Sequence, residues 1–170
     1  MKREQKIVAA GAATGVLSMV TALLVLPGWL PGLAVDADAG ERLAFAAKWI
    51  ALAALPLFLM IIAVGNGRFL SDAIDPTAGK EGHAMLINGR VADNTLQQYV
   101  LFVAATLAVA AVSRGDQLAL LAAAAVIFVV CRFAFWIGYR IDPLHRAFGF
   151  ASTAYLNIIL FAVALWRAWT

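Results

Sequence analysis

The sequence predicts an all-α integral membrane protein, a bundle of transmembrane helices, and three observations support this fold class. Hydrophobic residues make up 64% of the 170-residue chain and charged residues only 14%, whereas soluble domains are about 45–50% apolar and about 25% charged. Five apolar stretches are long enough to cross the hydrocarbon core, which takes about 20 residues of helix. No strand-like alternation of polar and apolar residues competes with these stretches.

The five predicted spans follow one another through short connections, with one exception. A polar loop over residues 68–93, with several Gly and Asp residues and Lys80, precedes the third span. Together with the segment PGWLPGLAVDADAGE, this loop is where we expect irregular structure. The predicted spans are residues 7–27, 43–67, 94–112, 117–139 and 147–166.

The first span has two interpretations. Basic residues precede it, and residues 37–39, Ala-Asp-Ala, resemble the cleavage site of a signal peptide. However, the uncharged run over residues 7–35 is far longer than the apolar core of a signal peptide, about 7–15 residues. We therefore expect residues 1–40 to form a retained transmembrane helix and an external loop, with cleavage as the alternative. Gly11 and Gly15 form a GxxxG pair on this helix, a pattern that allows close helix packing.

The distribution of basic residues predicts the orientation, because Lys and Arg accumulate on the cytoplasmic side of a membrane. They favour a cytoplasmic location for the N-terminus, the long loop and the connection that holds Arg140 and Arg146. The C-terminus is then outside, and four tryptophans lie near the outer interface: Trp29, Trp49, Trp166 and Trp169. We expect a multi-pass protein of a bacterial inner membrane, surrounded by lipids. The net charge of +3 reflects this orientation, so no nucleic-acid partner is expected.

Cysteine and histidine are too sparse for a disulfide or a metal centre. The one cysteine, Cys131, excludes an intrachain disulfide and is expected to be a small packed group. His83 and His145 have no cysteine or acidic neighbour at ligand spacing, so no metal site is expected.

Two polar sets lie near the predicted cytoplasmic ends of neighbouring spans, each at helical spacing on one face. The first set is Arg90, Asn94, Gln97 and Gln98, and the second is Arg132, Phe135, Trp136 and Tyr139. Asp142 and Pro143 suit the N-cap and the first position of the last helix. That start would place Arg146 in the first helical turn, near Tyr139. The sequence therefore predicts a basic, amide-rich pocket at the cytoplasmic interface.

Such a pocket suits a small anion with peptide-like groups. Guanidinium groups bind carboxylates through paired hydrogen bonds, and amide side chains both donate and accept. A neighbouring arginine also lowers the pKa of a bound thiol below its free value of about 8.5, which activates it as a nucleophile.

Each of these residues also has a purely structural interpretation. Arg140 is expected to extend its charge to the interface. Arg132 lies eight residues earlier, about 12 Å along a helix, where an arginine costs up to about 2.5–3.5 kcal/mol. We expect it to have a structural or ligand partner inside the bundle, with extension to the interface as the alternative. Asn94 and Gln97 could instead hold helices together.

The segments NGRVADNTLQQYVLF and CRFAFWIGYRIDPLHRAFGF resemble those of the MAPEG family, the membrane-associated proteins of eicosanoid and glutathione metabolism. Members of this family have a sequence similar to R-x3-N-x2-E at the start of one span. They then show R-x2-[YH]-x3-Y near the end of the next span and an arginine that opens the last. The matching positions here are Arg90, Asn94, Tyr99, Arg132, Tyr139 and Arg146.

The resemblance covers roughly residues 43–170 and implies a four-helix MAPEG-like domain over residues 41–170, preceded by one extra helix. It further implies a homotrimer that binds glutathione as a thiol cosubstrate at subunit interfaces on the cytoplasmic side. By this resemblance the glutathione-binding residues are Arg90, Asn94, Gln97, Tyr99, Arg132 and Tyr139. Arg146 would be the catalytic residue that stabilises the thiolate.

The chain departs from the family pattern at two positions. Gln97 stands where relatives have a glutamate that helps to hold glutathione, and it cannot pair with the ammonium group of the ligand. Phe135 lacks the hydroxyl or ring nitrogen of the aromatic residue or histidine in relatives. Two hypotheses follow. The first is a glutathione-dependent transferase or peroxidase acting on a lipophilic electrophile, and the alternative is a non-catalytic MAPEG-like scaffold or lipid-binding protein.

Overall fold

The computed structural model describes residues 2–170, and this part of the chain is helical with no strand. Five segments are long and apolar enough to cross a membrane, which confirms the predicted all-α membrane bundle. The elements are α1 (Arg3–Val25), η1 (Leu26–Gly28), α2 (Ala39–Ala53), α3 (Leu55–Phe69), α4 (His83–Val112), η2 (Gly115–Leu118), α5 (Ala119–Ile141) and α6 (Ala147–Trp169).

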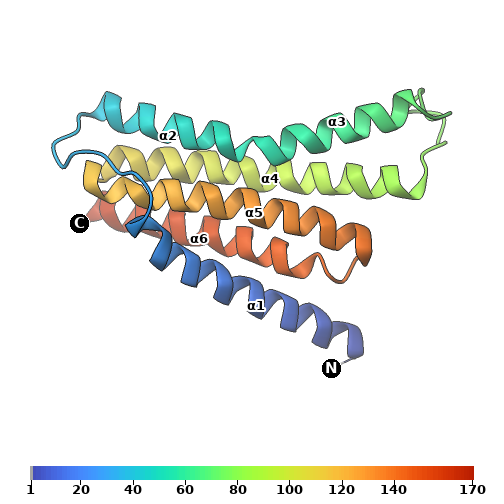
Figure 1. Cartoon of the computed structure of the whole chain (residues 1–170), viewed down its shortest axis with the longest axis horizontal. Helices are drawn as coiled ribbons and strands as arrows, with labels where there is room; N and C mark the ends of the chain where they lie inside the picture. Colours follow the sequence, from blue (N-terminus) through green and yellow to red (C-terminus); the bar gives the residue numbers. More distant parts are fainter. Residues whose placement is uncertain (1) are drawn as a thin grey trace.

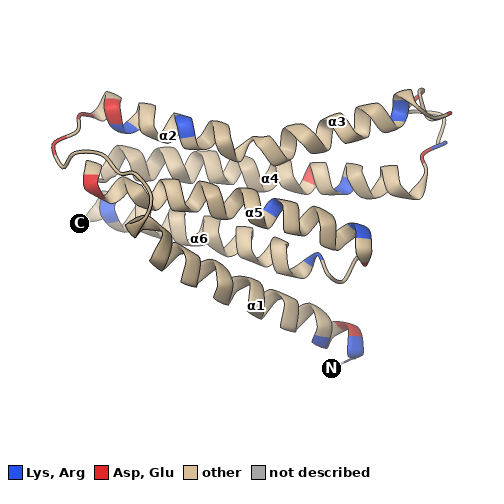
Figure 2. Cartoon of the chain, in the orientation of Figure 1, with Lys and Arg blue, Asp and Glu red and all other residues tan. Residues whose placement is uncertain are grey.

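The helices run along the long axis of the molecule, and α1 leans against α6 and diverges from it toward the N-terminus (Figure 1). One end of the bundle holds the N-terminus, the α3–α4 loop and the α5–α6 turn, and we call it the N-terminal end. The opposite end holds the C-terminus and the long α1–α2 connection. Charged residues gather at these two ends, with few along the helices between them (Figure 2). This pattern is expected of helices whose middle parts face lipid.

The core is built around α5, where small residues let neighbouring helices approach closely. Ala122, Ala123, Ala124 and Ala125 have no exposed surface. One turn later, the ring of Phe128 packs against Phe102 of α4, with 4.7 Å between the ring centres. Cys131 lies in the same core and is 6% exposed. Packing small side chains against large aromatic ones fills the space between helices that share few polar groups.

The second predicted span corresponds to one continuous segment that is long enough to cross a membrane. It is divided into α2 and α3 at Ala54, where Figure 1 shows a bend. Pro56 explains the division, since proline has no N–H to donate and its ring displaces the preceding turn. Tyr99 of α4 donates its hydroxyl hydrogen to the carbonyl oxygen of Ile50 over 3.2 Å. This hydrogen bond holds α4 against the last turns of α2, just before the bend.

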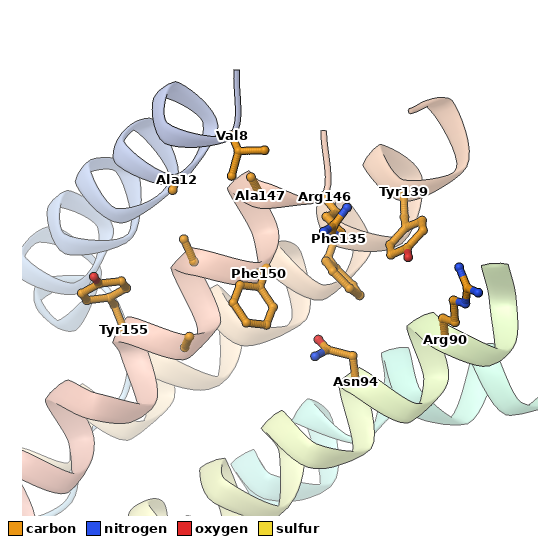
Figure 3. Close-up of a pocket in the computed structure, with 12 residues that line it drawn as sticks. Val8, Ala12, Arg90, Asn94, Phe135, Tyr139, Arg146, Ala147, Phe150 and Tyr155 are labelled. Atoms are coloured by element: carbon orange, nitrogen blue, oxygen red, sulfur yellow. The ribbon is translucent and has the colours of Figure 1, made fainter. Parts of the chain in front are cut away.

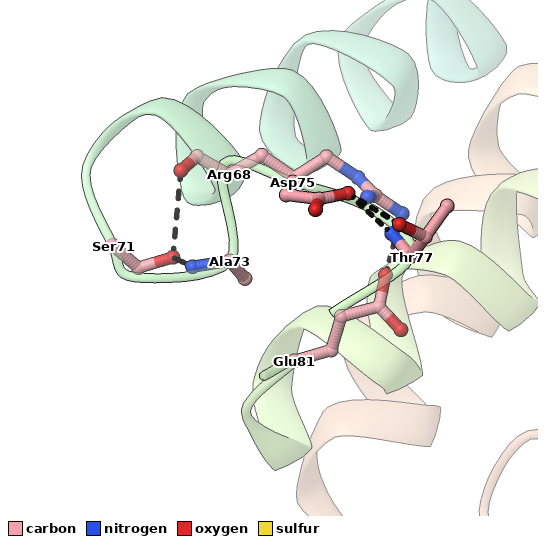
Figure 4. A network of polar contacts seen from close by, with 6 residues as sticks. All are labelled: Arg68, Ser71, Ala73, Asp75, Thr77 and Glu81. Atoms are coloured by element: carbon pink, nitrogen blue, oxygen red, sulfur yellow. Dashed lines mark hydrogen bonds and ion pairs between the residues drawn. The ribbon is translucent and has the colours of Figure 1, made fainter. Parts of the chain in front are cut away.

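The third span begins earlier than hydropathy predicts. Helix α4 starts at His83, so Arg90 lies inside a helix, and the predicted loop over residues 68–93 is wrong in its second half. The helix continues beyond the apolar region because its polar first turns can lie in water. The remaining loop is closed by an ion pair of 2.5 Å between Arg68 and Glu81 (Figure 4). Within it, the side chain and backbone of Thr77 donate to Asp75 and lower the pKa of that carboxyl group.

The last helix begins at the first residue of the predicted span 147–166, but later than its predicted cap. Helix α6 starts at Ala147 with Arg146 at its N-cap, so the predicted start at Asp142 and Pro143 is wrong. The Asp142 side chain instead accepts a hydrogen bond from the Leu144 N–H over 2.7 Å and closes a separate turn. This local turn uses the capping chemistry that would otherwise start the helix.

The first helix packs against α6 through its glycines. A Cβ atom on Gly15 would lie 2.8 Å from the Ser152 hydroxyl and closer still to the Phe148 carbonyl, so only glycine fits this contact. A Cβ on Gly11 would meet the Ala147 side chain at 3.4 Å, an ordinary contact distance. The GxxxG pair therefore lies at the α1–α6 contact.

Candidate functional site

A pocket of about 610 Å³ opens near the N-terminal end of the bundle, lined by residues of α1, α4, α5 and α6 and by Arg146 at the start of α6. It crosses the outward face of α6, with α1 on one side and α4 on the other (Figure 3). Its polar groups come from Arg90, Asn94, Tyr139 and Arg146. Its remaining walls are mostly apolar and include Val8, Ala12, Phe135, Phe150 and Tyr155.

Two arginines give one end of the pocket a positive charge. The guanidinium carbon of Arg146 lies 5.4 Å from the centre of the Tyr139 ring, and Nη1 of Arg146 donates to the Pro143 carbonyl oxygen. Arg90 reaches the same end from α4. The N-terminus of α6 adds a partial positive charge beside Ala147, because backbone N–H groups at a helix start are not paired within the helix. This end of the pocket therefore favours an anion.

Arg132 supports the pocket from behind and has no exposed surface. It donates to Asn94 Oδ1 over 3.1 Å and to Thr153 Oγ1 over 3.0 Å. The Phe135 ring covers it, with the guanidinium carbon 4.1 Å from the ring centre. The ion pairs within residues 2–170 are Arg68–Glu81 and Arg114–Asp116, so the partners of Arg132 are neutral. Its charge is not balanced by a carboxylate, and it adds to the positive potential of the pocket.

The arrangement also orients Asn94. Because the Asn94 oxygen accepts from Arg132, the amide nitrogen is the group that can donate to a ligand in the pocket. Trp136 turns away to α4, where its indole nitrogen donates to Asn88 Oδ1 over 2.9 Å. The pocket therefore brings together four of the site residues expected from sequence, and Arg132 lies directly behind one of them.

Two expected residues lie elsewhere. Gln97 is exposed on α4 and does not line the pocket. Tyr99 is directed to α2 through its bond with Ile50, and its ring centre lies 6.3 Å from that of Phe128. Within one protomer, neither side chain is therefore part of the pocket.

Sequence reasoning missed the polar face of α6. Thr153 holds Arg132, and one turn later Asn157 donates to the Gln98 side-chain oxygen over 3.0 Å. Gly149, one turn before Thr153, allows the close approach, since a Cβ there would lie 2.5 Å from the Phe135 nitrogen. The signal was present as small or polar residues at four-residue spacing on an apolar helix, a pattern typical of a buried helix face.

The comparisons with known proteins agree with this architecture. The family model described as MAPEG family matches residues 46–166, which is most of the chain and extends from the middle of α2 to the end of α6. No curated protein and no solved structure matches the chain. Helix α1 lies outside the matched residues. The resemblance seen in the sequence is thus confirmed, and the chain belongs to the MAPEG family, membrane-associated proteins of eicosanoid and glutathione metabolism.

Proposed function

We propose that the protein is a glutathione-dependent membrane enzyme, a transferase or peroxidase, that brings a cytoplasmic thiol to a lipophilic electrophile. The observation that carries this proposal is the division of the pocket into a cationic end and an apolar body. The two carboxylates of glutathione suit the cationic end, and an electrophile dissolved in the bilayer suits the apolar body. Membership of the MAPEG family supports the choice of thiol.

Each polar residue then has a definite task. Arg90 binds a carboxylate of the tripeptide, Asn94 donates to a peptide carbonyl, and the Tyr139 hydroxyl donates a further hydrogen bond. Arg146 holds the sulfur as a thiolate, because a nearby guanidinium favours the ionised form. Arg132 fixes Asn94 in position. The thiolate attacks the electrophilic carbon, a sulfur–carbon bond forms, and the leaving group departs with its electron pair.

One group of the ligand is not matched within a single protomer. None of the described residues that line the pocket carries a carboxylate, so the ammonium group of glutathione has no anionic partner there. We propose that a second protomer of a homotrimer completes the site over the half-exposed residues Phe150 and Tyr155. With the N-terminus in the cytoplasm, the cationic end of the pocket faces the compartment that supplies glutathione.

The alternative is a non-catalytic lipid-binding or scaffold protein. The apolar walls of the pocket and the position of Gln97 outside it favour this second candidate. An amphiphile with an anionic head would use the same division of the pocket without any reaction. The two candidates differ in whether a thiol becomes reactive.

Thermal unfolding in detergent, with and without glutathione, tests the proposal. A ligand at 100 times its dissociation constant stabilises the folded state by about 2.7 kcal/mol, so we expect the unfolding midpoint to rise. Formation of the conjugate with an aryl chloride should depend on Arg146 and not on Arg140, which is exposed and outside the pocket. Stabilisation by long-chain carboxylates alone, with no conjugate, would contradict the proposal and favour the lipid-binding candidate.

A further inference from the structure

The first helix contributes a wall to the pocket although it lies outside the residues matched by the family model. Val8 and Ala12 of α1 line the pocket. In Figure 3 they lie across from Arg90 and Asn94 of α4. The residues that line the cationic end all fall within the matched segment, whereas one wall of the apolar body does not. The pocket of this chain therefore depends on a helix that the family match does not include.

The close contact between α1 and α6 at Gly15 sets the position of Val8 and Ala12 relative to α6. Gly15, Ala12 and Val8 are separated by three and four residues, a spacing that places them on one helix face. At Gly15 the backbones of α1 and α6 touch, with no room for a Cβ beside Ser152 Oγ and the Phe148 carbonyl. Toward the N-terminus the helices diverge (Figure 1). Ala12 is one turn from this tight contact and lines the space of the pocket beside α6, whereas its neighbour Gly11 still approaches Ala147.

The small side chain at residue 12 sets how much of this space is free. Its methyl group is partly buried, whereas Ala13 beside it is exposed on the outward face of α1. A larger side chain at residue 12 would project into the pocket, because Ala12 is part of its lining. The same change at residue 13 would project into lipid. The two neighbouring alanines therefore form a matched pair for an experiment.

We propose that α1 is the size-limiting wall of the apolar part of the pocket, and that Ala12 determines the bulk of the lipophilic electrophile accepted there. This inference rests on the proposed glutathione-dependent function and adds the feature that selects the second substrate. Electrophiles with several fused rings need the space beside Ala12. A single-ring electrophile needs only the space near Phe135 and Tyr139, close to the thiolate.

Turnover with two electrophiles of different bulk tests the proposal. In a single-ring aryl chloride, the thiolate forms the sulfur–carbon bond and chloride leaves. In a polycyclic arene epoxide, the thiolate forms the sulfur–carbon bond at a ring carbon, the bond from that carbon to the epoxide oxygen breaks, and the oxygen takes a proton from water. Ala12→Phe should lower kcat/KM for the polycyclic epoxide at least tenfold and leave the single-ring substrate within about twofold of wild type, a change of about 0.4 kcal/mol. Ala13→Phe should leave both unchanged.

A second measurement, photolabelling, tests without catalysis whether a bulky ligand occupies the space beside Ala12. Pyrene bearing a diazirine is photolysed with the protein in detergent, and labelled peptides are identified by mass spectrometry. Wild type should be labelled on α1 and α6 around the pocket, Ala12→Phe should lose this labelling, and Ala13→Phe should keep it. Size-exclusion profiles and the unfolding midpoint of each variant establish that it is folded.

The outcomes separate the two proposals. If wild type conjugates both electrophiles and Ala12→Phe leaves kcat/KM unchanged for both, the proposed role of α1 as a size-limiting wall is refuted, and the proposed enzymatic function is not affected. If wild type conjugates neither electrophile but labelling depends on residue 12, the enzymatic function and the selection of electrophiles are refuted, and only the steric role of Ala12 in the pocket remains. Equal effects of Ala12→Phe and Ala13→Phe on turnover or on labelling refute the wall.

Discussion

At the scale of single residues, Arg132 shows how a charge is held inside a membrane protein. An arginine at the centre of a helix costs up to about 2.5–3.5 kcal/mol on insertion scales. Here Asn94 and Thr153 accept two of its hydrogen bonds, and the Phe135 ring stacks over the guanidinium group. The depth of Arg132 predicted a partner within the bundle. The sequence named neither partner, because Asn94 was assigned to ligand binding or helix packing and Thr153 comes from a helix that the motif spacing did not connect to Arg132.

Arg146 provides the sharpest prediction at this scale. If it stabilises the thiolate, Arg146→Ala should raise the pKa of bound glutathione and lower kcat by about tenfold to a hundredfold, with a smaller change in KM. This pattern marks an interaction made mainly in the transition state. Thiolate absorbance as a function of pH and conjugation kinetics with an aryl chloride measure the two effects.

Arg140→Ala is the matched control, because Arg140 is exposed and is not among the residues that line the pocket. It removes the same charge without altering the pocket, so its kinetics should stay within about twofold of wild type, a change of about 0.4 kcal/mol. Equal kinetics for Arg146→Ala and wild type would rule out the assigned role of Arg146.

At the scale of helices, hydropathy predicted the number and order of the spans but not their ends. It reports how long a segment stays in the hydrocarbon, whereas a helix can continue into water, as the first turns of α4 do from His83. The division at Ala54 was readable from Pro56, since proline interrupts a helix regardless of hydropathy. The apolar stretch over residues 147–166 began where α6 begins, at Ala147, but the predicted cap was wrong, because Asp142 suits an N-cap and a turn equally well.

At this scale we predict that the packing of α5 against α6 depends on the absence of a side chain at Gly149. A Cβ there would lie 2.5 Å from the backbone nitrogen of Phe135 and 2.7 Å from its Cβ, so Gly149→Ala should separate α5 from α6 and weaken the bond between Arg132 and Thr153. Overpacking of this kind costs about 1–3 kcal/mol. We expect a lower unfolding midpoint in detergent and weaker stabilisation by glutathione.

Gly89→Ala is the control for this helix prediction. Gly89 lies within α4, and a Cβ there would meet nothing within 4 Å. Alanine favours a helix over glycine by about 0.5–1 kcal/mol, so this variant should be as stable as wild type or slightly more stable. A Gly149→Ala protein that matches Gly89→Ala in stability would show that the α5–α6 contact adapts without cost.

At the scale of the whole molecule, the outward face of α4 has polar groups that one protomer leaves uncovered. Asp93 and Gln97 are four residues apart on this helix, and both are exposed. Asp93 directly precedes the predicted third span, and a carboxylate is costly where it faces lipid, so we expect water or a second protein surface opposite this face. The resemblance to the family implied that Gln97 binds glutathione, and a contact between protomers at this face would be compatible with that expectation.

The corresponding prediction is a homotrimer of the 18.1 kDa chain. Light scattering in a mild detergent, with detergent and lipid subtracted, should give about three times the chain mass. Asp93→Leu distinguishes the environments. It should weaken the trimer if Asp93 lies at a protomer contact, because a paired polar group is lost, and should stabilise the protein if Asp93 faces lipid. A monomeric or dimeric mass for wild type would contradict the proposal.

The burial of Cys131 has a practical and a chemical consequence. This thiol is the only one in the chain and is 6% exposed within the α5 core. A protein that handles electrophiles would therefore present no accessible thiol of its own, so the electrophile alkylates the thiol of the tripeptide and not that of the enzyme. For the experimenter, a cysteine introduced on any outward position becomes the single reactive handle. Spin labels or fluorophores attached there report helix movements without first removing a native thiol.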